Sequence, residues 1–309
     1  MKITIIGAAG TLGSCSAFNI LIHRLADEIV MIDPWEDVLK GHCLDLNYAA
    51  TGSDIIVRKG GYADMAGTDI VVMTAGAPSG AIKSRAELLP SSLPIIKESG
   101  DKINRYCPDA IVITETNPVD PLNYAMYLMS RDRDRRKYIG YSLNDTIRFK
   151  MWAAEALGVA SRRIDGLVLG EHGESQVMLF SSLRLDGKPV TVDEKTKAEV
   201  RAQPKIMLET FENLKPKRTA GWVSAVGTAA IINAVKNDTR ETLACDVVLN
   251  GEYGCRGLSM SVPAVVGAGG VQRVEALELN REEQEGLRKT ISVLSLYMRQ
   301  VEEYLGIKP

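Results

Sequence analysis

A histidine in the segment Gly170-Glu171-His172-Gly173 is the strongest candidate for acid–base chemistry in this sequence. It follows an apolar run, Ile164 to Leu169, that predicts a strand, and flanking glycines let a ligand approach the backbone closely. We expect the histidine to be exposed at the strand end. Because an imidazole titrates at about pH 6.5, His172 is suited to exchange a proton near neutral pH. An ordinary loop histidine is the alternative, so other motifs must decide.

A glycine-rich stretch, Gly7-Ala8-Ala9-Gly10-Thr11-Leu12-Gly13, lies between a short β-rich run and a helical pattern. Its glycines permit a tight turn, backbone contact with a pyrophosphate and close packing of helix on strand. The helix start offers free N–H groups and the positive end of its dipole. A turn that binds nothing is the alternative. The pattern predicts a dinucleotide site with contacts from Gly7, Gly10, Thr11, Leu12 and Gly13.

An acidic residue, Asp33, ends the next apolar run, about 20 residues after these glycines. A carboxylate at this place accepts hydrogen bonds from both ribose hydroxyls of NAD and repels the 2′-phosphate of NADP. The spacing therefore favours a binding turn and predicts NAD as the cofactor. We also expect cofactor contacts from Thr74 and Gly76, at the end of a later strand.

Two residues of a predicted helix, Asp145 and Arg148, can complete a site for hydride transfer. With NAD bound, the protein must supply a proton acceptor and a group that binds and orients the substrate. A buried carboxylate would fix the tautomer of His172 and stabilise its imidazolium form, and we assign this role to Asp145. Arg148, on the same helical face, can hold a substrate carboxylate through two parallel hydrogen bonds. Singly, each residue would be an ordinary ion-pair member.

Strands alternate with helices after the glycine turn, which predicts a parallel, doubly wound sheet of the α/β class. Strands are expected at 2–6, 29–32, 55–57, 70–74 and 110–114, and a helix at 93–106. The loops at the carboxyl edge of such a sheet hold the ligand. The polar loops at that edge are 76–85, 116–120 and 144–148.

The alternation weakens after about residue 140, which indicates a second, α+β domain. We expect helices at 145–157 and 220–235, a strand at Val177–Leu185, and a C-terminal amphipathic helix that begins at a capping box of Asn280 and Glu283. The apolar stripe of that last helix most simply packs in the core, with a subunit interface as the alternative. The predicted domains are a dinucleotide-binding domain at 1–140 and a substrate domain at 141–309.

Composition argues against several classes of partner. A formal net charge of -2 over 309 residues leaves no basic surface for nucleic acid or anionic lipid. No run reaches the ~20 apolar residues that span a bilayer, and the N-terminal run is too short for a secretory signal. The five cysteines are odd in number and form no C-x-x-C pair. We therefore expect no disulfide framework, no metal site and a cytoplasmic location.

Taken together, the motifs resemble those of the malate/lactate dehydrogenase family of 2-hydroxy-acid dehydrogenases, over essentially the whole chain. They occur in family order: the glycine turn, Thr116-Asn117-Pro118-Val119-Asp120, Asn144-Asp145 with Arg148, and Gly170-Glu171-His172-Gly173. The resemblance implies a Rossmann domain and a substrate domain, NAD-dependent hydride transfer to or from a small 2-hydroxy or 2-oxo acid, and a homodimer or homotetramer.

The same resemblance implies roles for individual residues. His172 would be the proton acceptor, Asp145 its partner and Arg148 the carboxylate clamp. Asn117 would form hydrogen bonds near the substrate and the nicotinamide, and Arg85 would polarise the substrate carbonyl from a mobile loop.

Departures from the family pattern bear on the substrate. Glu174 stands where Asp is common, on the far side of His172. Ser79 aligns where malate enzymes carry arginine and many lactate enzymes glutamine, and Val223 aligns with a helix position that faces the third substituent of the substrate. Because neither can pair a second carboxylate, we expect a weaker preference for oxaloacetate than in a typical malate enzyme. The alternative is a malate dehydrogenase proper, with Lys83 as the second cation.

Three rival interpretations make different demands. A short-chain dehydrogenase or epimerase needs a mid-chain Tyr-x-x-x-Lys pair, whereas the pair here is Tyr304 with Lys308, at the C-terminus. An NAD-dependent glycosidase needs a metal held by cysteine and histidine, and no cysteine lies within three residues of His172. A non-enzymatic NAD-binding protein would not need the catalytic residues that this chain retains.

Overall fold

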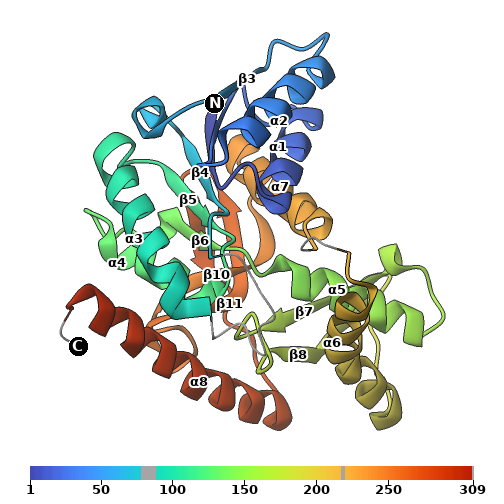
Figure 1. Ribbon diagram of the computed structural model, residues 1–309. Helices are drawn as coiled ribbons and strands as arrows, with labels where there is room; N and C mark the ends of the chain where they lie inside the picture. Colours follow the sequence, from blue (N-terminus) through green and yellow to red (C-terminus); the bar gives the residue numbers. More distant parts are fainter. Residues whose placement is uncertain (78–87, 217–219, 308–309) are drawn as a thin grey trace.

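A nine-stranded sheet forms the centre of the protein in the computed structural model, which describes residues 1–77, 88–216 and 220–307 (Figure 1). Its parallel strands run in the order β6-β5-β4-β1-β2-β3. This is the order of a doubly wound dinucleotide-binding fold, as predicted, and it places ligands at the carboxyl ends of the strands. The strands are β1 Lys2–Ile6, β2 Glu28–Ile32, β3 Ile56–Lys59, β4 Ile70–Met73, β5 Ile111–Thr114 and β6 Tyr138–Gly140.

Helices cover both faces of this sheet (Figure 1). Strands β4 and β5 are buried along their whole length, which is why both read as continuous apolar runs without alternation. The helices of this half are α1 Thr11–Ile22, α2 Glu36–Ala49, α3 Leu89–Tyr106 and α4 Val119–Met129. Helix α3 begins before the expected residue 93, because Pro90 in its first turn suits a helix start.

The second half of the chain continues the same sheet. Strand β10 pairs antiparallel with β6 through Asp246 and Gly140, and β11 and β12 extend the edge. A separate three-stranded sheet is formed by β7, β8 and β9. The predicted division near residue 140 therefore stays a prediction, since one sheet runs across it. The strands are β7 Ile164–Leu169, β8 Val177–Leu185, β9 Lys188–Pro189, β10 Glu241–Asn250, β11 Arg256–Gly267 and β12 Gly270–Val274.

Four helices belong to this half: α5 Leu143–Ala156, α6 Glu194–Leu214, α7 Trp222–Asn237 and α8 Arg281–Leu305. The predicted capping box at α8 is present, since Asn280 and Glu283 each accept a hydrogen bond from the backbone N–H of the other. The predicted stripe packs in the core, with Leu287, Leu294, Met298 and Val301 buried. Among the described helices, none is both long and apolar enough to cross a membrane.

Candidate active site

The glycine-rich turn joins β1 to α1 at the carboxyl edge of the sheet. Gly7 has φ +92°, and a Cβ there would lie 2.4 Å from the backbone nitrogen of Ala75. A Cβ on Gly13 would lie 2.5 Å from the carbonyl oxygen of Gly7, and the Thr74 hydroxyl donates to that same oxygen at 3.1 Å. No side chain caps the start of α1 at Gly10. The helix N-terminus therefore keeps backbone N–H groups for a phosphate, as the sequence predicts.

Asp33 lies directly after β2 and beside this turn. Its Oδ2 accepts a hydrogen bond from the Ala9 N–H at 3.0 Å, and its Oδ1 accepts one from the Trp35 N–H at 2.9 Å. These bonds hold the carboxylate in place. Since a carboxylate has about four lone-pair sites, Asp33 retains the capacity to accept from ribose hydroxyls as well.

His172 is 6% exposed, so the expectation of a histidine exposed at a strand end was wrong. Its loop folds back because Gly170 forms a β-bridge with Ser261 of β11. The backbone N–H of His172 donates to both carboxyl oxygens of Asp120, at 3.2 and 3.1 Å. Its ring Nδ1 lies 2.6 Å from Oδ2 of Asp145. When Nδ1 carries the proton of this hydrogen bond, Nε2 is the proton-accepting nitrogen.

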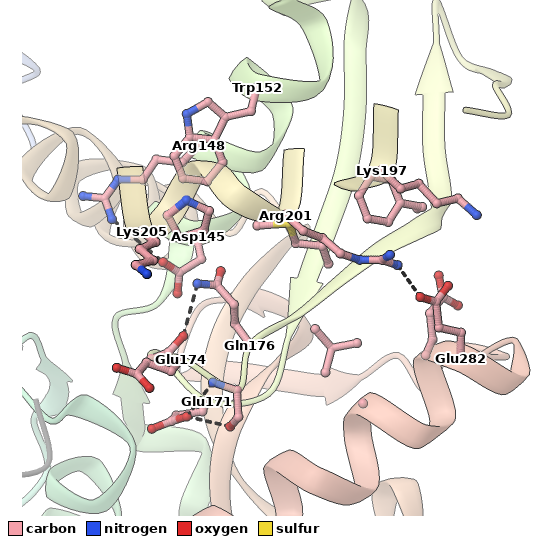
Figure 2. A pocket seen from close by; sticks show the side chains of 18 of the residues that line it. Asp145, Arg148, Trp152, Glu171, Glu174, Gln176, Lys197, Arg201, Lys205 and Glu282 are labelled. Atoms are coloured by element: carbon pink, nitrogen blue, oxygen red, sulfur yellow. Dashed lines mark hydrogen bonds and ion pairs between the residues drawn. The ribbon is translucent and has the colours of Figure 1, made fainter. Parts of the chain in front are cut away.

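Arg148 lies one helical turn after Asp145 on α5. Its Nη1 is 3.9 Å from Oδ1 of Asp145, and both side chains are largely buried. Figure 2 shows the two side chains next to each other at the edge of a cavity. The structure thus brings together His172, Asp145 and Arg148, which the sequence places on two segments.

The first turn of α7 links the glycine turn to this group. A Cβ on Gly221, which precedes α7, would lie 3.1 Å from Cγ2 of Thr11. The hydroxyl of Tyr141 donates to Oδ1 of Asn144 at 2.7 Å and lies 3.2 Å from the backbone carbonyl oxygen of Val223. Since Asn144 directly precedes Asp145, the start of α7 lies beside both the predicted cofactor turn and the segment that carries the carboxylate paired with His172. Val223 itself is half-buried at this junction.

Asn117 follows β5 and lies in a loop packed against the end of β4. The Thr116 hydroxyl donates to the carbonyl oxygen of Ala75 at 2.8 Å, and a Cβ on Gly76 would lie 2.6 Å from Cγ2 of Thr116. Oδ1 of Asn117 is buried and has no hydrogen-bond partner in the described part of the chain. The predicted residues Ser79, Lys83 and Arg85 lie outside the described residues.

A cavity of about 1270 Å³ borders the site (Figure 2). Its walls come from α5, β8, α6 and the start of α8, with Trp152 contributing apolar surface and Arg201 paired to Glu282 at 2.5 Å. Asp145 and Arg148 line the cavity, whereas His172 does not. The cavity therefore gives access to the predicted carboxylate clamp from the second half of the chain.

Buried acids near the site were not assigned roles from the sequence. Asp120 and Asp246 are both buried, and neither carboxyl oxygen of Asp246 has a hydrogen-bond partner of normal geometry among the described residues. Burial raises the pKa of Asp246 to about 7, and burial together with the charge of Asp246 raises that of Asp120. Two facing carboxyls of this kind retain a proton near neutral pH. Asp120 belongs to the motif at 116–120, but no local sequence pattern indicated that Asp246 would be buried beside it.

Glu115 is a further buried acid, at the end of β5. Burial raises the pKa of its carboxyl to about 8, although the Thr228 hydroxyl lowers it in part. In the sequence, Glu115 is one acid after an apolar run, and no spacing distinguishes it from a solvated loop residue. Its burial follows from packing against α7 and the end of β6.

A doubly wound sheet with a glycine turn, an acid after β2 and a buried His–Asp pair beside an arginine defines an NAD-dependent dehydrogenase of the malate/lactate type. Residues 1–140 match the family model of the lactate/malate dehydrogenase NAD binding domain, and residues 143–305 match that of the lactate/malate dehydrogenase alpha/beta C-terminal domain. The chain belongs to the lactate/malate dehydrogenase family, and its cofactor is NAD.

Known relatives and solved structures agree with this assignment. The chain is 36% identical to malate dehydrogenase of Natronomonas pharaonis, covering 92% of this chain and 94% of the relative. It is 34% identical to that of Halobacterium salinarum, covering 95% and 97%. Malate dehydrogenase of Cryptosporidium parvum has a TM-score of 0.92 at 28% identity, covering 98% and 99%. Lactate dehydrogenase of Cryptosporidium parvum, complexed with lactic acid and NAD, has a TM-score of 0.91 at 28% identity, covering 97% and 98%.

Proposed function

We propose that His172 exchanges the proton of the substrate hydroxyl while hydride moves between NAD and a 2-hydroxy acid. The observation that carries this proposal is the 2.6 Å contact between Nδ1 of His172 and the carboxylate of Asp145. In the oxidative direction, Nε2 accepts the hydroxyl proton and Asp145 stabilises the imidazolium that forms. In the reductive direction, the imidazolium returns the proton to the carbonyl oxygen. NAD supplies or accepts the hydride.

Arg148 is proposed to hold the substrate carboxylate. Its guanidinium is largely buried and borders both the cavity and Asp145, so a carboxylate bound there is oriented relative to His172. Asn117, with its buried and unpartnered Oδ1, is proposed to bind the substrate or the nicotinamide. Arg85, outside the described residues, is proposed to polarise the carbonyl.

The test of this assignment is the variant His172→Asn. Turnover should fall by about two to four orders of magnitude, the usual contribution of a positioned proton donor, while NADH affinity stays nearly unchanged. His23→Asn is the matched control, because His23 is exposed and lies outside the site. Turnover at the wild-type level in His172→Asn would disprove the assignment. No oxidation of NADH with any 2-oxo acid would instead support a protein that binds NAD without catalysis.

The identity of the acid is a separate proposal. Arg148 serves the carboxylate common to all 2-hydroxy acids, so selectivity depends on what meets the third substituent. With Ser79 and Val223 at those positions, we propose a weaker preference for oxaloacetate over neutral 2-oxo acids than a typical malate enzyme shows. The relatives named above are malate dehydrogenases, which favours the alternative, a malate dehydrogenase in which Lys83 pairs the second carboxylate.

A comparison of kcat/KM for oxaloacetate, pyruvate and bulkier 2-oxo acids distinguishes the proposed weak preference for oxaloacetate from the alternative with Lys83. Ser79→Arg should raise the preference for oxaloacetate, because it adds a cation that can pair the second carboxylate. If the wild type strongly prefers oxaloacetate and Lys83→Ala abolishes that preference, the alternative holds. A strong preference that survives Lys83→Ala would contradict both accounts of the pocket.

We infer a homodimer or homotetramer from an apolar surface that we call the α1–α2–α7 face. These helices lie together in Figure 1. All three helices expose apolar side chains, and apolar surface left open on neighbouring helices marks an interaction surface. Light scattering should give a mass of two or four chains, and a charge at Leu44 should lower it; a wild-type monomer would contradict the inference. The exposed apolar residues of the face are Phe18, Ile22, Val38, Leu44, Tyr48, Trp222 and Val226.

A further inference from the structure

Glu115 is a buried acid that has no role in the proposed reaction. Its side chain is 4% exposed, and neither carboxyl oxygen has a hydrogen-bond partner of normal geometry within the described residues. Its backbone N–H donates to the carbonyl oxygen of Met73 at 2.9 Å, so the residue is held in line with β5. Because a buried polar group without a partner is unfavourable, such a group in a native fold calls for a specific reason.

Among the described residues, no cation acts on the Glu115 carboxyl to hold it ionised. Thr228 of α7 and Tyr141 at the end of β6 interact with its carboxyl. The other titratable groups around Tyr141 are Cys245 on β10, and Asp145 and Arg148 on α5. Burial raises the pKa of Tyr141 and of Cys245, so both stay neutral at neutral pH. The Glu115 carboxyl, by contrast, has its pKa raised to about 8 by burial and so changes charge just above neutral pH.

The position of Glu115 relative to the sheet points to the cofactor. The glycine turn after β1 suits the pyrophosphate, and Asp33 after β2 suits one ribose, so the remaining half of the dinucleotide extends toward the ends of β4, β5 and β6. Glu115 directly follows β5, two residues before Asn117, and lies beside Thr228 of α7. Gly221, which precedes α7, lies close to Thr11 of the glycine turn. The nicotinamide ring carries a positive charge when oxidised and none when reduced.

We propose that the Glu115 carboxyl lies beside the nicotinamide ring, and that binding of NAD⁺ ionises this group whereas binding of NADH leaves its protonation unchanged. The inference rests on the proposed function for the direction in which the cofactor extends. Binding of NAD⁺ then releases the Glu115 proton to solvent, because a cation in a site of low dielectric favours the neighbouring carboxylate. Binding of NADH leaves the proton in place. Glu115 thus makes the preference between the two cofactor forms depend on pH.

The test measures cofactor binding rather than turnover. All variants carry His172→Asn, which removes the imidazole as a second group able to exchange a proton with solvent. The Kd of NAD⁺ should tighten by about tenfold between pH 6.5 and 9, the factor that corresponds to one unit of pKa, and that of NADH should change less than about twofold. Addition of Glu115→Gln should leave both constants independent of pH, since the amide has a similar shape and no charge.

Two further variants make the test specific. Thr228→Val removes the hydroxyl that lowers the pKa of Glu115, so the pH at which NAD⁺ binding tightens should move upward. Asp246→Asn removes a carboxyl that titrates in a similar range but lies on β10, and it should leave the pH dependence of NAD⁺ binding in place. Calorimetry in two buffers of different ionisation enthalpy counts the released protons in the His172→Asn protein, without any change at Glu115.

Separate outcomes overturn the inference and the proposed function. If both cofactor forms bind but the Kd of NAD⁺ is independent of pH and no proton is released, the inference is wrong and the proposed role of His172 stands. If Glu115→Gln leaves the pH dependence intact, or Asp246→Asn removes it, the inference is also wrong. If neither cofactor form binds, both the inference and the proposed function fail.

Discussion

The carboxylate of Asp145 lies 2.6 Å from Nδ1 of His172, and both side chains are buried. The backbone N–H of the same histidine donates a shared hydrogen bond to the two carboxyl oxygens of Asp120. One acid therefore orients the ring and the other orients the backbone. The ring is thus positioned before substrate binds, which would lower the reorganisation required by the proton transfer that we propose for it.

Asp145→Asn should lower kcat by roughly two to four orders of magnitude, because the amide neither enforces the Nδ1–H tautomer nor stabilises the imidazolium. The Kd of NADH should stay within about twofold, since the change leaves the glycine turn intact. Steady-state kinetics and fluorescence titration measure the two effects. Asp165→Asn is the matched control, an exposed aspartate paired to Lys150 on the surface. A kcat equal in both variants would contradict the role of Asp145.

Asp33 should make the wild-type protein prefer NAD over NADP, because a 2′-phosphate beside this carboxylate sets like charges at contact distance. Asp33→Asn keeps an oxygen that can accept from the Ala9 N–H but removes the charge, so the ratio of kcat/KM values for NAD and NADP should fall. The exposed Asp37 of α2 provides the matched Asp37→Asn control. Equal efficiency of the wild type with both cofactors would refute this prediction.

Asp246→Asn should change how stability depends on pH. The carboxyl ionises near its ordinary value of 3.8 in the unfolded chain but near 7 in the folded protein, because it is buried. Folding thus holds a proton that the unfolded chain releases, so the free energy of unfolding decreases as pH rises between these values.

The side chain in Asp246→Asn does not titrate, so the variant does not lose free energy of unfolding in this way as pH rises. Its amide can also donate a hydrogen bond to Asp120. At pH 8 it should be more stable than the wild type by on the order of 1–3 kcal/mol, and at pH 5 the gain should be much smaller. Urea unfolding at the two pH values checks this. A gain that is the same at both would show that the carboxyl does not titrate as described.

Gly13→Ala should lower both the free energy of unfolding, by about 1–3 kcal/mol, and the affinity for NADH, because its Cβ would meet the Gly7 carbonyl at 2.5 Å. Gly41→Ala is the matched control. Gly41 is exposed within α2 with no atom within 4 Å of a new Cβ, so alanine there should stabilise the protein by about 0.5–1 kcal/mol. Thermal unfolding and NADH titration compare them, and equal effects would contradict the close-packed turn.

Short-range patterns determined much of this protein from the sequence alone. The strand Val177–Leu185, the capping box of Asn280 and Glu283, and the glycine turn followed by Asp33 were predicted because each depends on residues close together in the chain. Helix α6 was not predicted, because its residues are mostly polar and give no clear apolar stripe. Its only buried residue is Val200.

Tertiary structure decided the environment of the residues for which we propose catalytic roles. The burial of His172 depends on the bridge between Gly170 and Ser261, and the carboxyl pair forms because β10 adds to the edge of the parallel sheet beside α4. Glu115 became a buried acid because α7 packs over the end of β5. Such contacts join segments far apart in the chain, and their free energies depend on burial and on neighbouring charge. The residue types therefore specified the class of chemistry, whereas only packing set which groups are buried, paired and protonated.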